Sequence, residues 1–159
     1  MIVLHLPIEP MGCPRPRATI RGAHASVYMP ADYRKWQQAA ATAIHGAILA
    51  AGYVEFSRLM VSGFGARISV EAVFPRTQAA PASVGRPLWK TGCRVRFRRF
   101  DADNVLKACM DALQVAIRER IGAETWDDKS LEIGRVDRWY AAAGEEPHIR
   151  MTLEPLEDA

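Results

Sequence analysis

The stretch from Asp103 to about Arg120 constrains the fold most, because its residues separate into two arcs at helical spacing. At about 100° per residue, Asp103, Lys107 and Asp111 fall on one polar arc, and the opposite arc is apolar except for Arg120. This pattern predicts an amphipathic helix whose apolar side packs on a core. Cys109 lies on the apolar arc, so we predict that it is a buried and unreactive thiol.

A second helix and several strands surround this segment. Helical spacing from Pro30 to about Ala51, followed by Gly52, predicts a helix on which Tyr33 and Trp36 are core residues rather than base-stacking residues. Strands are predicted at Ile2–Ile8, Arg67–Phe74, Leu131–Tyr140 and His148–Leu153. This order of elements predicts an α+β protein: a single small domain over residues 1–159, with a mixed β-sheet of about four strands packed with two main helices.

Several classes of protein are disfavoured by what the chain lacks. No segment approaches the roughly 20 apolar residues of a membrane span, and the N-terminus has no basic leader. Cys13, Cys93 and Cys109 are odd in number and widely spaced, which argues against a disulfide framework or a zinc site. We therefore expect a cytoplasmic protein with no membrane partner.

The charge of the chain is distributed unevenly along the sequence. Residues 1–100 hold 14 Lys/Arg against 4 Asp/Glu, a net charge of +10, whereas residues 101–159 hold 7 against 14, a net charge of −7. Such asymmetry indicates one surface for a polyanion and one acidic cluster that needs cations. The alternative is that the two halves neutralise each other across the fold.

Two short segments concentrate the basic residues. Residues 11–29 are predicted to be a loop, in which prolines hold Arg15 and Arg17 on a stiff, extended backbone. Alternation in the later basic run places Arg94, Arg96 and Arg98 on one face of an extended strand. These five arginines are the candidate phosphate-binding residues, because phosphate contacts provide affinity without reading sequence.

The acidic cluster begins where the first amphipathic helix begins. Asp101 and Asp103 are two residues apart, so an extended backbone directs both carboxylates to one side, and Lys107 follows one helical turn later. Two carboxylates about 4 Å apart repel each other by about 4 kcal/mol at an effective dielectric constant near 20. A divalent cation removes this repulsion, and a ligand set of oxygens favours Mg²⁺ or Mn²⁺.

Each of these acidic residues also has a purely structural interpretation. Asp101 could cap the helix, and Asp103 could complement its dipole or pair with Lys107. Asp127-Asp128, which precedes the strand at Leu131, could be only a turn. The neighbouring basic strand, the lysine one turn later and the second acidic pair favour the functional interpretation.

The sequence resembles the RusA family of Holliday-junction resolvases. The central similarity is Phe100-Asp101-Ala102-Asp103-Asn104-Val105-Leu106-Lys107-Ala108, then Asp111-Ala112-Leu113, then Trp126-Asp127-Asp128-Lys129-Ser130-Leu131. Gly12-Cys13-Pro14-Arg15-Pro16-Arg17 and the segment from Tyr28 to Trp36 also resemble family positions. The resemblance covers about residues 3 to 153, and residues 75–98 depart from it.

The resemblance implies a Mg²⁺-dependent endodeoxyribonuclease that cleaves four-way DNA junctions as a homodimer, and the oxygen ligand set would also accept Mn²⁺. It places the essential carboxylates, and hence the metal ligands, at Asp101, Asp103 and Asp128, and the essential lysine at Lys107. Asp111 and Asp127 match acidic positions to which it assigns no definite role. One competing interpretation is a branched-DNA-binding protein without catalysis. Another is a nucleotide-sugar transferase, and the short chain and the arginine run disfavour this second alternative.

Overall fold

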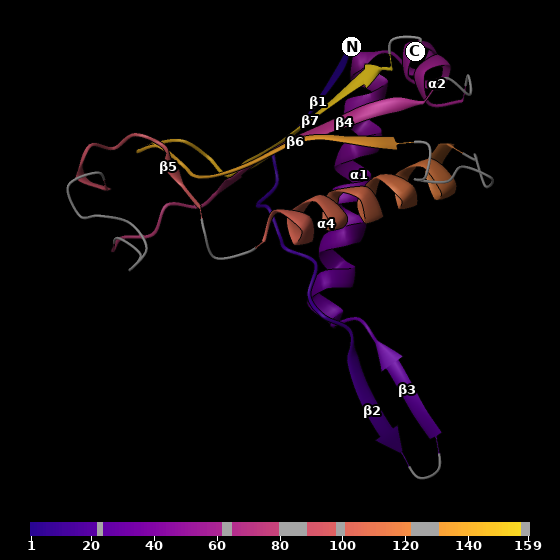
Figure 1. Cartoon of the computed structure of the whole chain (residues 1–159), viewed down its shortest axis with the longest axis horizontal. Helices are drawn as coiled ribbons and strands as arrows, with labels where there is room; N and C mark the ends of the chain where they lie inside the picture. The colour runs from indigo at the N-terminus through magenta and orange to yellow at the C-terminus, as the bar shows by residue number, and fades with distance from the viewer. Residues whose placement is uncertain (22–23, 62–64, 80–88, 98–100, 122–130, 157–159) are drawn as a thin grey trace.

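A five-stranded mixed sheet forms the centre of the protein (Figure 1). The computed structural model describes residues 1–21, 24–61, 65–79, 89–97, 101–121 and 131–156. The strand order is β1 (Ile2–Leu6), β7 (His148–Pro155), β4 (Ala66–Phe74), β6 (Leu131–Tyr140) and β5 (Val95–Arg96). Strands β4 and β6 are parallel, and the other neighbouring pairs are antiparallel. The α+β prediction is confirmed, with five strands in the main sheet where about four were expected.

The helices pack on one face of this sheet. They are α1 (Ala31–Ala51), α2 (Tyr53–Val61) and α4 (Ala102–Val115), which η1 (Ala116–Ile121) continues as a π-helical segment. Alternate strand residues such as Leu4, Ile68 and Met151 are fully buried against Ile44 of α1 and Leu113 of α4. The burial of these side chains provides the main stabilisation and holds α4 in place on the sheet.

The predicted burial of side chains on α1 and α4 is confirmed. Tyr33 is buried, and Trp36 packs partly buried against the core clusters, as expected of core aromatic residues. Cys109 is also buried, and its burial raises the pKa of the thiol to about 12. A thiol of this kind stays protonated at neutral pH, which agrees with the prediction that it is unreactive.

Helix α2 was not predicted from the sequence. Gly52, at a φ of 113°, ends α1, and the chain then turns into α2 instead of a loop. Phe56 and Met60 of α2 are buried in the main core, so this short helix closes one end of it. Among the described helices, none alone is long and apolar enough to span a membrane; α1 and α2 meet both requirements only when taken together, and they are bent by 109° where they join.

The prediction of a loop over residues 11–29 was wrong in its second half. Residues 17–28 form a two-stranded antiparallel ribbon of β2 (Arg17–Arg21) and β3 (His24–Tyr28), in which Arg17 pairs with Tyr28 and Ala18 with Val27. The ribbon extends away from the sheet and helices, beyond the N-terminal end of α1 (Figure 1). The prolines indicated an isolated extended segment, whereas the observed segment is extended and hydrogen-bonded to a second strand.

Candidate active site

Helix α4 presents Asp101 and Asp103 at its N-terminus. Asp101 is the N-cap residue, with extended backbone angles of φ −67° and ψ 150°, yet its side chain makes no capping hydrogen bond. Asp103 lies in the first turn, and both residues are exposed. The capping interpretation therefore does not account for the Asp101 carboxylate, which is left free to bind a ligand.

Lys107 follows on the same helix without neutralising these carboxylates. It lies one turn beyond Asp103, about 6 Å further along the helix axis, and it is exposed. No ion pair joins Asp103 and Lys107, or links either to another residue in the described ranges. The ion-pair interpretation of this spacing thus lacks support, and two carboxylates and an ammonium group remain available at one helix end.

Asp111 has a different environment from these residues. Its Oδ2 atom accepts a hydrogen bond of 2.8 Å from the hydroxyl of Tyr33 on α1. Burial raises the pKa of Tyr33, and the hydrogen bonds and charge around the hydroxyl raise it further, so the phenol remains a neutral donor. Asp111 is two helical turns, about 12 Å, from Asp103, too far to share a metal ion with it.

The segment that leads into the β2–β3 ribbon is attached to the first turns of α4. The backbone amide of Cys13 donates a 2.8 Å hydrogen bond to the carbonyl of Asn104. Cys13, Tyr33 and Ala108 form a small buried cluster, which Met11 and Met29 flank on either side of the ribbon. The base of the ribbon is therefore held next to the helix end that carries Asp101 and Asp103.

The exposed carboxylates suit a hard divalent cation in their chemistry. Asp101 and Asp103 offer only oxygen ligands, which is the ligand type that Mg²⁺ and Mn²⁺ prefer. In the described ranges no group of three His, Cys, Asp or Glu residues is placed to hold a metal ion. The other predicted acidic residues, Asp127 and Asp128, lie outside the described residues, as does Arg98.

Arg94 and Arg96, two of the predicted phosphate-binding residues, are engaged in ion pairs. Arg94 donates a 2.8 Å hydrogen bond from Nε to Glu145 and lies 3.3 Å from Glu71. Arg96 contacts Asp137 at 2.8 Å and stacks over the ring of Trp139. Arg96 lies on the two-residue strand β5 and Arg94 directly precedes it, and both contact acidic partners on neighbouring segments instead of forming a long basic edge.

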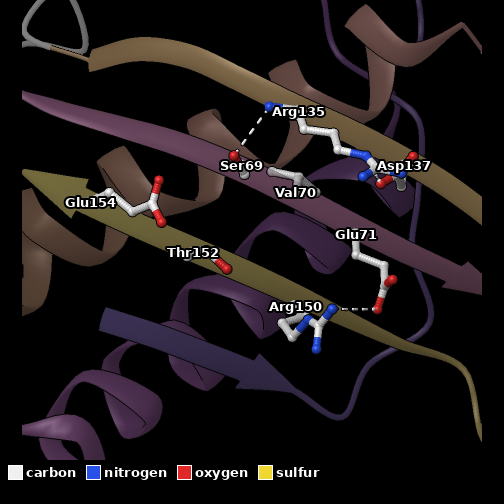
Figure 2. Close-up of a pocket in the computed structure, with 8 residues that line it drawn as sticks. All are labelled: Ser69, Val70, Glu71, Arg135, Asp137, Arg150, Thr152 and Glu154. Atoms are coloured by element: carbon white, nitrogen blue, oxygen red, sulfur yellow. Dashed lines mark hydrogen bonds and ion pairs between the residues drawn. The ribbon is translucent and has the colours of Figure 1, made fainter. Parts of the chain in front are cut away.

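These ion pairs continue across the face of the sheet that the helices leave open (Figure 2). Arg150 reaches Glu71 at 3.3 Å, and Arg135 forms an ion pair with Asp137. The shallow hollow there, of about 240 Å³, is lined by Ser69, Val70, Glu71, Arg135, Asp137, Arg150, Thr152 and Glu154. Because basic and acidic side chains alternate across it, this face has little unbalanced positive charge for a polyanion.

Arg15 and Arg17 differ from the arginines of the sheet. Both are exposed at the start of the β2–β3 ribbon, and neither forms an ion pair with a residue that the structure describes. The sequence assigned the same role to all five arginines. Only the contacts to Glu145 and Asp137, which lie 51 and 41 residues further along the chain, distinguish Arg94 and Arg96 from the ribbon pair.

The comparison with known protein families finds a match over most of the chain. The family model for the RusA endodeoxyribonucleases matches residues 7–121, more than two thirds of the chain. The matched range includes the ribbon, the whole of α4 and the exposed charged groups at Asp101, Asp103 and Lys107. No curated protein matches the chain. The chain belongs to the RusA endodeoxyribonuclease family.

Proposed function

We propose that the protein is a Mg²⁺-dependent, structure-selective endonuclease that resolves Holliday junctions and related branched DNA during recombination and repair. The observation that carries this proposal is the pair of exposed carboxylates, Asp101 and Asp103, free at the N-terminus of α4 and followed by Lys107. Membership of an endodeoxyribonuclease family supports DNA as the substrate. We expect the protein to act on cytoplasmic DNA.

Asp101 and Asp103 would hold the metal ion together with Asp128, which the sequence resemblance assigns to the same site. A divalent cation supplies Lewis-acid polarisation of the scissile phosphate and activation of water at neutral pH. Lys107 would stabilise negative charge that develops on the phosphate in the transition state. Asp111 supports this helix through Tyr33 rather than through the metal, and Asp127 is a further acidic residue next to Asp128.

DNA binding is assigned mainly to Arg15 and Arg17, because their guanidinium groups are exposed and have no acidic partner among the described residues. Arg94 and Arg96 would have to exchange Glu145 and Asp137 for phosphates, so we expect each to contribute less. Arg98 retains its predicted role as a phosphate ligand. Because contacts of this kind release counterions, the affinity for DNA should fall steeply as salt is added.

A homodimer is the assembly that suits this reaction. One chain supplies one pair of metal-binding carboxylates at α4, whereas resolution of a four-way junction needs two nicks on strands related by a two-fold axis. A two-fold symmetric dimer places one site at each of these strands, and such dimers are the commonest homo-oligomers. The dimer therefore explains how a small chain with one site makes paired cuts.

Cleavage of a cruciform plasmid in Mg²⁺ or in EDTA tests this proposal. We expect paired cuts in Mg²⁺ to give linear DNA early in the reaction, and no cleavage in EDTA. Open circles that accumulate first would indicate independent nicks by single subunits. Binding of the cruciform without cleavage in Mg²⁺ or Mn²⁺ would favour the alternative, a branched-DNA-binding protein without catalysis.

A further inference from the structure

The β2–β3 ribbon makes few contacts with the other described elements of the chain. Its strands pair with each other, and in Figure 1 they extend beyond the end of α1, away from the sheet. Arg17, Ala18, Val27 and Tyr28, the ribbon residues whose exposure the structure describes, are all exposed and lie outside the buried core clusters. A two-stranded hairpin alone is at best marginally stable in water, so a ribbon of this kind is expected to gain order from a binding partner.

The chemistry of the ribbon and the segments beside it points to a polyanionic partner. The sequence has no acidic residue between Glu9 and Asp32, whereas it holds Arg15, Arg17 and Arg21 there. Arg15 and Arg17 are exposed and free of ion pairs with the described residues. Val27 and Tyr28 on the second strand are 71% and 45% exposed, so apolar surface lies beside the positive charge.

The dimensions of the ribbon match a groove of duplex DNA. Each strand has five residues, which corresponds to a length of about 17 Å, and paired strands lie about 4.8 Å apart. The major groove of B-DNA is about 12 Å wide and about 8.5 Å deep, and it admits a two-stranded ribbon. Val27 lies opposite Ala18 and Tyr28 lies opposite Arg17, so exposed apolar side chains and an arginine share one end of the ribbon. At this end the apolar side chains can contact base edges, while the arginine reaches the phosphates at the rim of the groove.

We propose that the β2–β3 ribbon binds in the major groove of one duplex arm of the DNA substrate. This inference rests on the proposed function and adds a second contact to it, outside the metal site. Because the Cys13 to Asn104 hydrogen bond and the buried cluster around Tyr33 fix the base of the ribbon to α4, the arm is held at a set position relative to Asp101 and Asp103. The ribbon thereby selects which phosphate lies at the carboxylates.

Methylation protection of a junction in EDTA tests this proposal, because dimethyl sulfate modifies guanine N7 in the major groove. The variant replaces residues 18–27 by two glycines, which can close the directly opposed pair Arg17 and Tyr28. We expect the wild-type protein to protect guanines on one arm near the branch point. The shortened protein should lose this protection and at least tenfold in junction affinity, with an unchanged thermal unfolding midpoint of the core.

Two point variants separate ribbon contacts from general electrostatic attraction. Arg17→Ala should make the slope of log affinity against log salt concentration shallower, by the amount expected for the loss of about one phosphate contact. Arg67→Ala removes the same charge from the open face of the sheet, where Arg67 pairs with Glu132 at 2.9 Å, and should leave the dependence unchanged. Equal effects of the two substitutions would contradict a specific role for the ribbon.

Guanine protection that survives in the shortened protein would overturn the proposal. So would a shortened protein that changes from dimer to monomer in light scattering without DNA, because the ribbon's partner would then be a second copy of the chain. Cleavage of junctions by the wild-type protein in Mg²⁺ is a separate measurement. If the ribbon protects the groove but no cleavage occurs, the proposed function fails while the ribbon contact stands.

Discussion

The hydroxyl of Tyr33 on α1 donates a 2.8 Å hydrogen bond to the Asp111 carboxylate on α4, across 78 residues of sequence. This bond joins the helix that begins just after the ribbon to the helix that begins with the candidate metal ligands. Tyr33 is buried, and its phenol stays neutral because burial raises its pKa. The bond therefore joins α1 to α4 through a neutral donor on α1.

Tyr33→Phe should lower the free energy of unfolding by about 1–2 kcal/mol, because it removes a hydrogen bond to a charged group. Asp111→Asn keeps an acceptor for the Tyr33 hydroxyl, so it should change stability less and leave junction cleavage within about tenfold of wild type. Urea unfolding and a cleavage assay measure the two effects. Complete loss of cleavage in Asp111→Asn would show that Asp111 belongs to the metal site.

Lys107→Ala should reduce the turnover of junction cleavage by about a hundredfold or more, because its positive charge is needed chiefly in the transition state. The affinity for the junction should change little. Lys35→Ala is the matched control, since Lys35 is an exposed lysine on α1 with no proposed role. A Lys107→Ala protein that loses affinity but keeps its single-turnover rate would make Lys107 only a phosphate anchor.

Glu145 should contribute to the acid sensitivity of the fold. Its hydrogen bond with Arg94 holds the pKa of Glu145 below its ordinary value. A carboxylate with a lowered pKa stabilises the folded state fully above about pH 4.3, and this stabilisation is lost as pH falls through the lowered pKa. Unfolding midpoints measured from pH 6 to pH 3 should therefore fall less steeply for Glu145→Gln than for wild type. Equal slopes would mean that the Arg94 pair adds no stability.

The sequence predicted α4 and the place of the Asp-x-Asp pair at its start, because both depend on local patterns. Residues such as Leu106, Cys109 and Leu113 recur at helical spacing, and they are buried as that spacing requires. The Asp-x-Asp pair lies directly at the helix start, so its position relative to Lys107 follows from helix geometry alone. The prediction extended the helix to about Arg120, where the structure continues α4 as a π-helical segment.

Features that depend on distant contacts could not be derived in this way. Alternation predicted an extended basic strand at residues 94–99, but only the pairing of Val95 with Tyr140 and Arg96 with Trp139 defines β5. The ribbon was missed because Pro14 and Pro16 dominated the interpretation of the segment. A usable signal was the alternation after Arg17, interrupted by Gly22, which is typical of a hairpin.

Junction cleavage and junction binding by Asp103→Asn and Asp32→Asn test whether the active site lies at the N-terminus of α4. Asp32 is the matched control, because it is also exposed in the first turn of a helix and its replacement removes the same charge. We predict that Asp103→Asn lowers the cleavage rate in Mg²⁺ by at least about a thousandfold, with junction affinity unchanged or tighter, and that Asp32→Asn cleaves like wild type. An Asp103→Asn protein that still cleaves junctions at the wild-type rate would contradict the assignment of the active site to the N-terminus of α4.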